Sequence, residues 1–194
     1  MAVSNVAIAN RALTKLGAAR IIALDDDAQA SNTLESMFDT VRDAELRASL
    51  WHFSKARAKL PRLSQAPAFG FSSQFQLPAD CLRVIQIGDA LTNPKPATDS
   101  WYSIEGGRIL IDHPGPLNIR YVKRVEDPTL FDALFVEAFA CRLAAEACET
   151  LTQSNTKKQA AWQEYEQALS VARRANAIER PALAMSDDTW LESR

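Results

Sequence analysis

The chain has 194 residues, of which 47% are apolar and 24% are charged, and this composition fits one ordinary globular domain with a hydrophobic core. The formal net charge of −2 and the isoelectric point of about 5.7 exclude a globally basic nucleic-acid binder, so any basic patch must be local. No apolar run approaches the ~18 residues that a membrane span needs, and the first residues lack the basic and apolar segments of a secretory signal.

Two helices are predicted at the start of the chain. Ser4 can cap a helix that Gly17 ends, and apolar residues recur between them at helical spacing. After an acidic connector, a second helix is predicted from about residue 28 to residue 50, with one face that is apolar apart from a single acid. That face contains Leu34, Met37, Phe38, Val41, Glu45 and Ala48, and Arg42, Asp43 and Arg47 are predicted to lie elsewhere.

From residue 51 the hydrophobic period changes from helical to two, which indicates strands. Residues 51–63 are predicted to form a strand with one mixed face of aromatic and basic side chains. That face contains Trp51, Phe53, Lys55, Arg57 and Lys59. Gly106-Gly107 predicts a hairpin turn, and a further strand should follow Pro114-Gly115-Pro116. Residues 51–126 are therefore predicted to be a mostly antiparallel sheet region.

Helices are predicted again after the sheet region. Asp127 and Pro128 fit the first positions of a helix that is apolar nearly all round, as is typical of a central helix. Glu137 is an isolated acid on an apolar side of this helix. Ser154 can cap a last helix that runs to about Ala177. Its apolar stripe contains Trp162, Tyr165, Leu169 and Ala172.

These elements predict one α+β domain over residues 1–194. Helical segments 1–50 and 127–178 should form a single bundle, because neither pair of helices could bury its apolar stripe alone. The β region, 51–126, is then an insertion that leaves the bundle and returns to it. Residues 179–194 are predicted to be an irregular C-terminal tail.

No catalytic or metal site is evident from the sequence. Cys81, Cys141 and Cys148 are an odd number of cysteines without a nearby histidine, so we expect free thiols, a reducing cytosol and no metal or cofactor. His52 has no evident serine, cysteine or carboxylate partner and is interpreted as structural, and His113 as a loop residue.

Four stretches of the sequence resemble the tail tubular protein A family, the head-to-tail adaptors or gatekeepers of short-tailed bacteriophages. They are "SNVAIANRALTKLGAARI", "VRDAELRASLWHFSKARAKL", "LPADCLRV" and "EDPTLFDALFVEAFACRLAAE". The resemblance extends over about residues 3–177 in the same order, and its most specific part is the W-x-F-x-x-x-R-x-x-L pattern followed by L-P-x-D-C-L-R-V.

The resemblance implies a structural protein of the virion tail that assembles in the host cytoplasm. Such adaptors form a ring of about twelve subunits below the portal protein and offer a docking surface to the tail nozzle protein, of the tail tubular protein B type. Tail fibres are a further candidate partner, and the lumen passes DNA. The family has a helical part, a β part and no established catalytic constellation, and DNA contact in its lumen should be transient and independent of sequence.

A ring gives several residues a candidate role, because each subunit buries two different faces against its neighbours. Lys55, Arg57, Lys59 and Glu137 are candidates for the subunit interface or the lumen. Solubility and edge protection are the alternative for the three cations, and an intrachain partner is the alternative for Glu137. In the tail, Leu183, Met185, Trp190 and Leu191 predict a segment that docks on the portal, with a frayed terminus as the alternative.

Two other functions are considered. The first is a phage-associated peptidoglycan hydrolase that uses paired carboxylates, for which the chain offers Asp25, Asp26, Asp27, Asp80 and Asp112. No pair among them is singled out, and activity lost on replacing one acid would support this function. The second is a dedicated nucleic-acid binder, which the acidic isoelectric point and the lack of a recognition motif disfavour.

Overall fold

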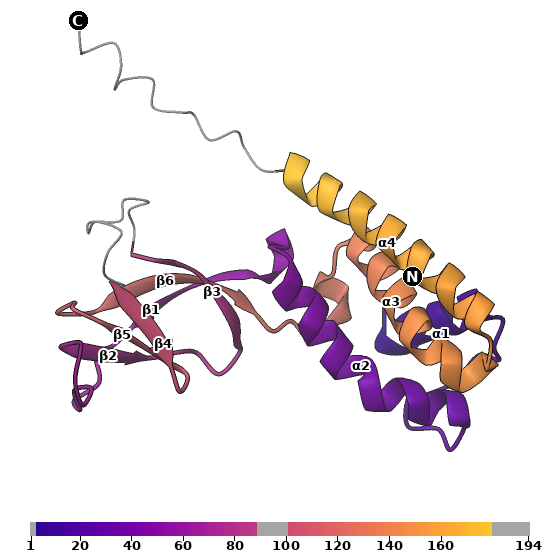
Figure 1. The fold of residues 1–194 in the computed structure, drawn as a ribbon, viewed down its shortest axis with the longest axis horizontal. Helices are drawn as coiled ribbons and strands as arrows, with labels where there is room; N and C mark the ends of the chain where they lie inside the picture. Colours follow the sequence, from indigo (N-terminus) through magenta and orange to yellow (C-terminus); the bar gives the residue numbers. More distant parts are fainter. Residues whose placement is uncertain (1–2, 89–100, 180–194) are drawn as a thin grey trace, which may run out of the picture.

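The computed structural model describes residues 3–88 and 101–179, which form a helical bundle with a sheet insertion that projects from one end of it (Figure 1). The bundle consists of α1 (Asn5–Leu16), α2 (Gln29–Ala48), α3 (Ala133–Thr152) and α4 (Asn155–Ile178). The insertion consists of β1 (Lys55–Leu60), β2 (Ser73–Gln76), β3 (Cys81–Ile87), β4 (Tyr102–Glu105), β5 (Arg108–Ile111) and β6 (Leu117–Lys123). The predicted α+β fold is confirmed.

The first helix begins and ends at the predicted residues. The Ser4 hydroxyl accepts a hydrogen bond from the Ala7 N–H at 3.1 Å, which satisfies one of the free donors of the first turn. Gly17 adopts a left-handed conformation with φ of 70°, which a residue with a side chain rarely takes, and this ends the helix.

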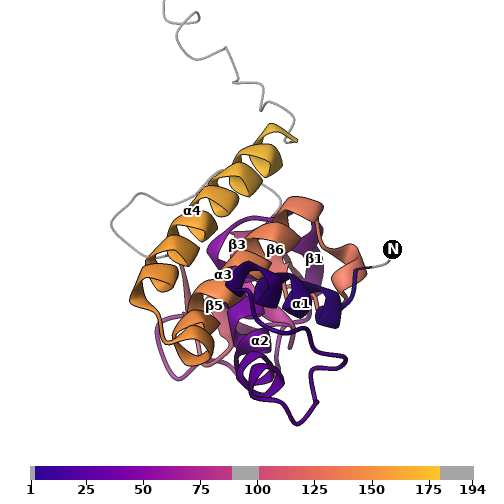
Figure 2. The same cartoon turned by 90° about the vertical axis from the view of Figure 1, so that its right-hand side faces the viewer.

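Helices from both ends of the chain share one hydrophobic core, as predicted. The other three helices pack around α3, which is buried along most of its length (Figure 2). Phe38 of α2 contacts Phe139 of α3 edge to face, with ring centroids 5.1 Å apart. Leu13 of α1 and Ala172 of α4 belong to the same buried cluster. The apolar composition of α3 on all sides is therefore explained by its central position.

The insertion contains two three-stranded antiparallel sheets with a core of their own. The strand orders are β1-β6-β3 and β2-β5-β4, and the predicted hairpin at Gly106-Gly107 joins β4 to β5. The core of the insertion includes Leu60, Phe75, Ile109, Leu117 and Ile119. The prediction of a mostly antiparallel region is confirmed, and the division into two sheets depends on pairings between distant strands.

Two predicted boundaries are wrong. The strand predicted over residues 51–63 spans only Lys55–Leu60, and residues His52–Ser54 before it form a short 3-10 helix. Trp51 and Phe53 are thus not on the strand. Their rings contact Phe135 in the bundle core, and their centroids lie 5.1 and 5.0 Å from the centroid of the Phe135 ring. Packing these two large aromatic rings against the bundle core stabilises the 3-10 helix, although the alternating pattern at these positions favours a strand.

The second wrong boundary is the start of the central helix. Asp127 caps a short 3-10 helix, Pro128–Leu130, rather than α3. The cap of α3 is Asp132, whose carboxylate accepts hydrogen bonds from the N–H groups of Leu134 and Phe135 at 2.8 and 3.2 Å. Two acids suitable as caps lie five residues apart, and the turn between them brings Phe131 into the core.

Candidate interaction surfaces

The predicted row of cations forms the outer face of the sheet β1-β6-β3. Alternate residues of β1, Ala56, Ala58 and Leu60, pack on the core of the insertion, so Lys55, Arg57 and Lys59 point to the opposite face. In the register of the sheet, Arg57 lies directly opposite Arg120 of the central strand β6. Arg57, Lys59 and Arg120 are exposed, and we call these three residues the basic sheet face.

A cavity of about 310 Å³ lies against the basic sheet face. Its lining combines the polar side chains of Arg57, Arg120 and Gln86 with the apolar side chains of Leu50 and Ile85. Lys55 also lines it, and its ammonium lies 3.4 Å from Nδ1 of His52. His52 can approach Lys55 in this way because it lies in the 3-10 helix that precedes β1 and not on the strand. A cavity lined by both cationic and apolar side chains suits an anionic group on a partly apolar surface.

Glu137 is paired within the chain. Its carboxylate forms ion pairs with Arg11 and with Lys15 of α1, the latter at 2.8 Å, and Lys15 also contacts Glu164 of α4. Burial alone would raise the pKa of Glu137, but the adjacent cations outweigh this effect and lower it. Glu137 thus has the partners within the chain that were considered as the alternative, and its contact with a neighbouring subunit stays a prediction.

Glu137, Cys141 and Glu164 form a group whose donor atoms, all within 4.8 Å of one another, could in principle bind a metal ion. The Lys15 ammonium contacts both carboxylates, so the chain itself supplies the cation for this group. Burial opposes the charge of Lys15, yet the two carboxylates raise its pKa above the ordinary value. The arrangement is that of a structural ion cluster that joins α1, α3 and α4.

A second polar cluster explains the acid in the apolar face of α2. Glu45 is buried, and its carboxylate accepts a hydrogen bond of 2.6 Å from the Tyr165 hydroxyl of α4. Burial raises the pKa of Glu45, and the hydrogen bond from Tyr165 counteracts part of this shift. Arg142 of α3 lies 3.8 Å from the same carboxylate and stacks on the rings of Trp162 and Tyr165. A buried acid on α2 and a buried tyrosine on α4 were both evident in the sequence, but their pairing was not.

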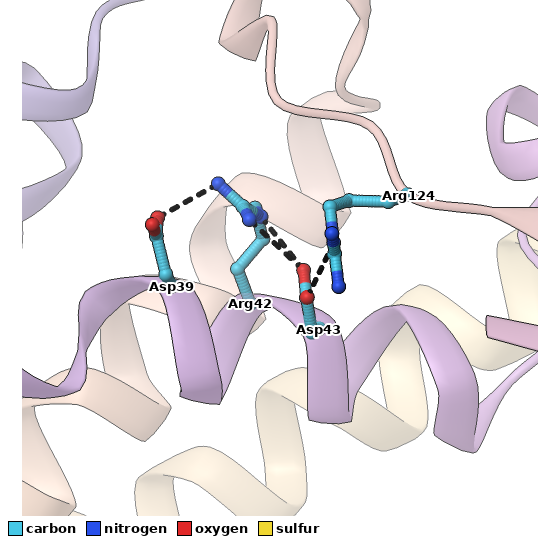
Figure 3. Close-up of polar contacts among 4 residues, drawn as sticks. All are labelled: Asp39, Arg42, Asp43 and Arg124. Carbon is cyan, nitrogen blue, oxygen red and sulfur yellow. Dashed lines mark hydrogen bonds and ion pairs between the residues drawn. The ribbon is translucent and has the colours of Figure 1, made fainter. Parts of the chain in front are cut away.

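The joint between the bundle and the insertion is a chain of four charged residues (Figure 3). Arg42 of α2 contacts Asp39 at 2.8 Å and donates twice to Asp43 at 3.0 Å, and Asp43 accepts from Arg124, just after β6, at 2.6 Å. The prediction that Arg42 lies away from the buried face is wrong, since its side chain is only 5% exposed. Both Arg42 donors reach Oδ1 of Asp43, and Arg124 reaches Oδ2, so each oxygen of this carboxylate has a cationic partner.

Three of the five candidate acids of the hydrolase hypothesis, Asp26, Asp80 and Asp112, accept hydrogen bonds from the chain itself. Asp26 accepts from the N–H groups of Ile22 and Ala23, and Asp80 accepts from the Tyr121 hydroxyl at 3.1 Å. Asp112 accepts from the N–H of Ser72. Asp25, Asp26 and Asp27 lie in the connector between α1 and α2, whereas Asp80 and Asp112 lie in the insertion.

Both histidines make local contacts. His52 Nε2 lies 2.6 Å from the carbonyl oxygen of Asn176 on α4, and the His52 N–H donates to the side chain of the same residue. His113 Nδ1 accepts from the Gly115 N–H at 3.0 Å. The cysteines Cys81, Cys141 and Cys148 are free thiols, as predicted. The proposed portal-docking residues Leu183, Met185, Trp190 and Leu191 lie outside the described residues.

Several large apolar side chains of the bundle are exposed. Ile22 of the α1–α2 connector is 91% exposed, and Val171 and Ile178 of α4 are 56% and 76% exposed. Scattered single apolar residues are ordinary on a protein surface, whereas Val171 and Ile178, seven residues apart, share one side of α4. This side is available to a partner.

Comparisons with known proteins place the chain in no family. No protein-family model matches it, and a search of curated proteins finds no significant relative. Within the described residues, none of the helices has both the length and the apolar composition to cross a membrane.

Proposed function

We propose that this protein is a head-to-tail adaptor of a short-tailed bacteriophage, a subunit of a ring of about twelve copies between the portal protein and the tail nozzle. The proposal starts from the resemblance of four sequence stretches to the tail tubular protein A family. The further support comes from what the residues of those stretches do in the fold.

The residues of these stretches whose contacts are described are structural, and some of them lie where the bundle meets the insertion. Trp51 and Phe53, the aromatic pair of the most specific stretch, connect β1 to the bundle core. Asp80, from the stretch that follows, accepts a hydrogen bond from Tyr121 of β6. Asn10, from the first stretch, fixes the α1–α2 connector by two hydrogen bonds of 2.8 Å to Ile21.

This use of the shared residues is the observation that carries the proposal. Conserving a catalytic site requires polar side chains that converge on one cavity. Apart from Lys55 and Arg57, which line the cavity at the sheet face, the described residues of these stretches supply helix caps, core aromatic rings and joints between elements. Such roles are expected of a structural subunit. The exposed side of α4 and the exposed Ile22 provide apolar surface that a single subunit leaves uncovered.

The test is binding to the portal protein of the same phage. Full-length protein and purified portal are mixed and separated by sedimentation, and the mass of each species is measured. The proposal predicts a complex in which several copies of this chain bind one portal ring. A chain that sediments alone at micromolar concentrations of both proteins would contradict it.

A further inference from the structure

Charge is segregated along the described part of the chain. The insertion residues 51–88 and 101–126 contain nine lysines and arginines against four acids, a surplus of five positive charges. The helical residues 3–50 and 127–179 contain ten lysines and arginines against fifteen acids, a surplus of five negative charges. Since the insertion projects from one end of the bundle, the molecule is elongated (Figure 1), and its two parts carry net charges of opposite sign.

At the positive end, two arginines face each other across neighbouring strands. Like charges directly opposite in a sheet are destabilising, and among the described residues no ion pair relieves Arg57, Lys59 or Arg120. Protection of an exposed sheet edge accounts for cations on the edge strand β1. It does not account for Arg120, because β6 is the central strand. The arrangement favours an external acidic partner.

At the negative end, the α1–α2 connector and the start of α2 lie at the side of the bundle remote from the sheet (Figure 1). Asp25, Asp27 and Glu35 are exposed there, and no described residue forms an ion pair with them. Ile22, almost fully exposed, lies in the same connector, whose turn is fixed by hydrogen bonds to Asp26. We call Ile22, Asp25, Asp27 and Glu35 the acidic end.

We infer that copies of this chain associate head to tail, with the basic sheet face of one copy bound to the acidic end of the next. The two surfaces are complementary in charge and in apolar character. Cations and apolar side chains line a cavity on one surface, and exposed acids accompany the exposed side chain of Ile22 on the other. A contact between two different surfaces is heterologous, and repeating it yields a ring when the rotation closes.

A second copy of the chain is favoured over DNA as the partner of the basic sheet face. The surplus of charge on the two parts is equal and opposite, so copies neutralise each other, whereas the acidic chain as a whole repels a polyanion. The inference deepens the proposed function, on which it rests for the existence of a ring. Duplex DNA is an alternative occupant that the experiment separates.

The test is a charge exchange between the two surfaces of the full-length chain. One variant, Arg57→Glu with Arg120→Glu, makes the sheet face acidic. Another, Asp25→Lys with Glu35→Lys, makes the acidic end basic. All four side chains are exposed, so both variants should fold, which circular dichroism and thermal melting verify. Assembly is measured as mass by sedimentation, alone and on the portal, at low and high salt.

Each variant alone should assemble at least about a hundredfold more weakly than the natural chain, because it brings like charges together. An equimolar mixture should regain assembly, since each contact then joins opposite charges again. Ile22→Ser should weaken assembly without changing the charge. The control Lys157→Glu with Arg174→Glu, on exposed positions of α4, changes the net charge as much as the sheet-face variant does and should assemble normally.

Several outcomes would overturn the inference. One is that either charge-reversed variant assembles normally, and another is that the equimolar mixture does not regain assembly. A third is that the variants lose only the binding of a labelled 20-base-pair duplex, which would identify DNA as the partner of the basic sheet face. Rings that form regardless of these charges would leave the proposed function intact. A natural chain that stays single in every setting would contradict both proposals.

Discussion

The hydrogen bond between Tyr165 and Glu45 should make a measurable contribution to stability. Replacing Tyr165→Phe removes the hydroxyl and keeps the ring that stacks on Arg142. Both residues are buried, and the Tyr165 hydroxyl lies 2.6 Å from the Glu45 carboxylate, whereas the Arg142 guanidinium lies 3.8 Å from it. A buried acceptor that loses its donor costs about 1–3 kcal/mol, so we expect a loss of about 2 kcal/mol.

The assay is urea and thermal unfolding followed by circular dichroism. For a chain of this length, 2 kcal/mol corresponds to a decrease in the melting temperature of about 4–8 °C. The control is Tyr102→Phe, because Tyr102 is half-buried and no described residue accepts a hydrogen bond from its hydroxyl. This variant should shift the free energy of unfolding by less than about 0.5 kcal/mol.

The pH dependence of this variant provides a second readout. Burial raises the pKa of Glu45 above its value in the unfolded chain, so its ionisation disfavours the folded state. Without the Tyr165 hydroxyl that pKa rises further, because the bond to the charged form is lost. The deficit of Tyr165→Phe should therefore decrease as the pH falls towards 4.5, the ordinary value for Glu45. A Tyr165→Phe deficit no larger than that of Tyr102→Phe, or one independent of pH, would refute the reasoning.

Three further predictions follow from the ion pairs and the tail. Asp43→Asn should lower the free energy of unfolding, measured in urea titrations, by about 2–4 kcal/mol, because Arg42 and Arg124 lose the carboxylate between them. The control is Asp39→Asn, which should lower it by less than about 1 kcal/mol because the Asp39 side chain is 78% exposed. The lowered pKa of Glu137 means that its contribution to stability is present above 4.5, its ordinary value, and is lost as the pH falls through the lowered one. Melting curves of Glu137→Gln should accordingly lie below those of the natural chain at pH 7 and approach them at pH 3, and parallel curves would contradict this. Deleting residues 180–194 should change the melting temperature by less than about 2 °C and weaken portal binding in the sedimentation assay; unchanged binding would count against the tail as the docking segment.

The helices could be predicted because their signals are local. Ser4, Gly17 and Ser154 occupy the caps that their side chains or backbone flexibility favour, and the apolar composition of α3 required a central place. The start of α3 was predicted at Asp127 rather than Asp132 because either acid satisfies the cap rule, and only the position of Phe131 in the core decides between them.

The residues that join the elements could not be predicted from local pattern. Arg42 is buried because Arg124, 81 residues beyond Asp43, helps to position the carboxylate that it binds. Glu45 and Tyr165 are 120 residues apart, so periodicity placed each on a buried face without pairing them. The sequence did contain one clue to this pairing. A buried acid needs a hydrogen-bond donor and a buried tyrosine hydroxyl needs an acceptor, so the two residues could satisfy each other.

The three cations of β1 were predicted to share one face, but Arg120, which lies beside them on β6, was not predicted to join them. Period two placed Lys55, Arg57 and Lys59 on one face, but the sheet register that sets Arg120 beside Arg57 comes from strands far apart in the chain. The repulsion between these two arginines became evident only once β1 and β6 were paired.

Electron microscopy of the full-length chain bound to its portal protein tests the central claim most directly. Averaged end-on views, together with the mass of the complex, report the number and arrangement of copies. The account predicts a closed ring of about twelve copies with adjacent subunits in head-to-tail contact. Images and masses in which the portal carries no copies, or carries isolated copies that never touch one another, would contradict it.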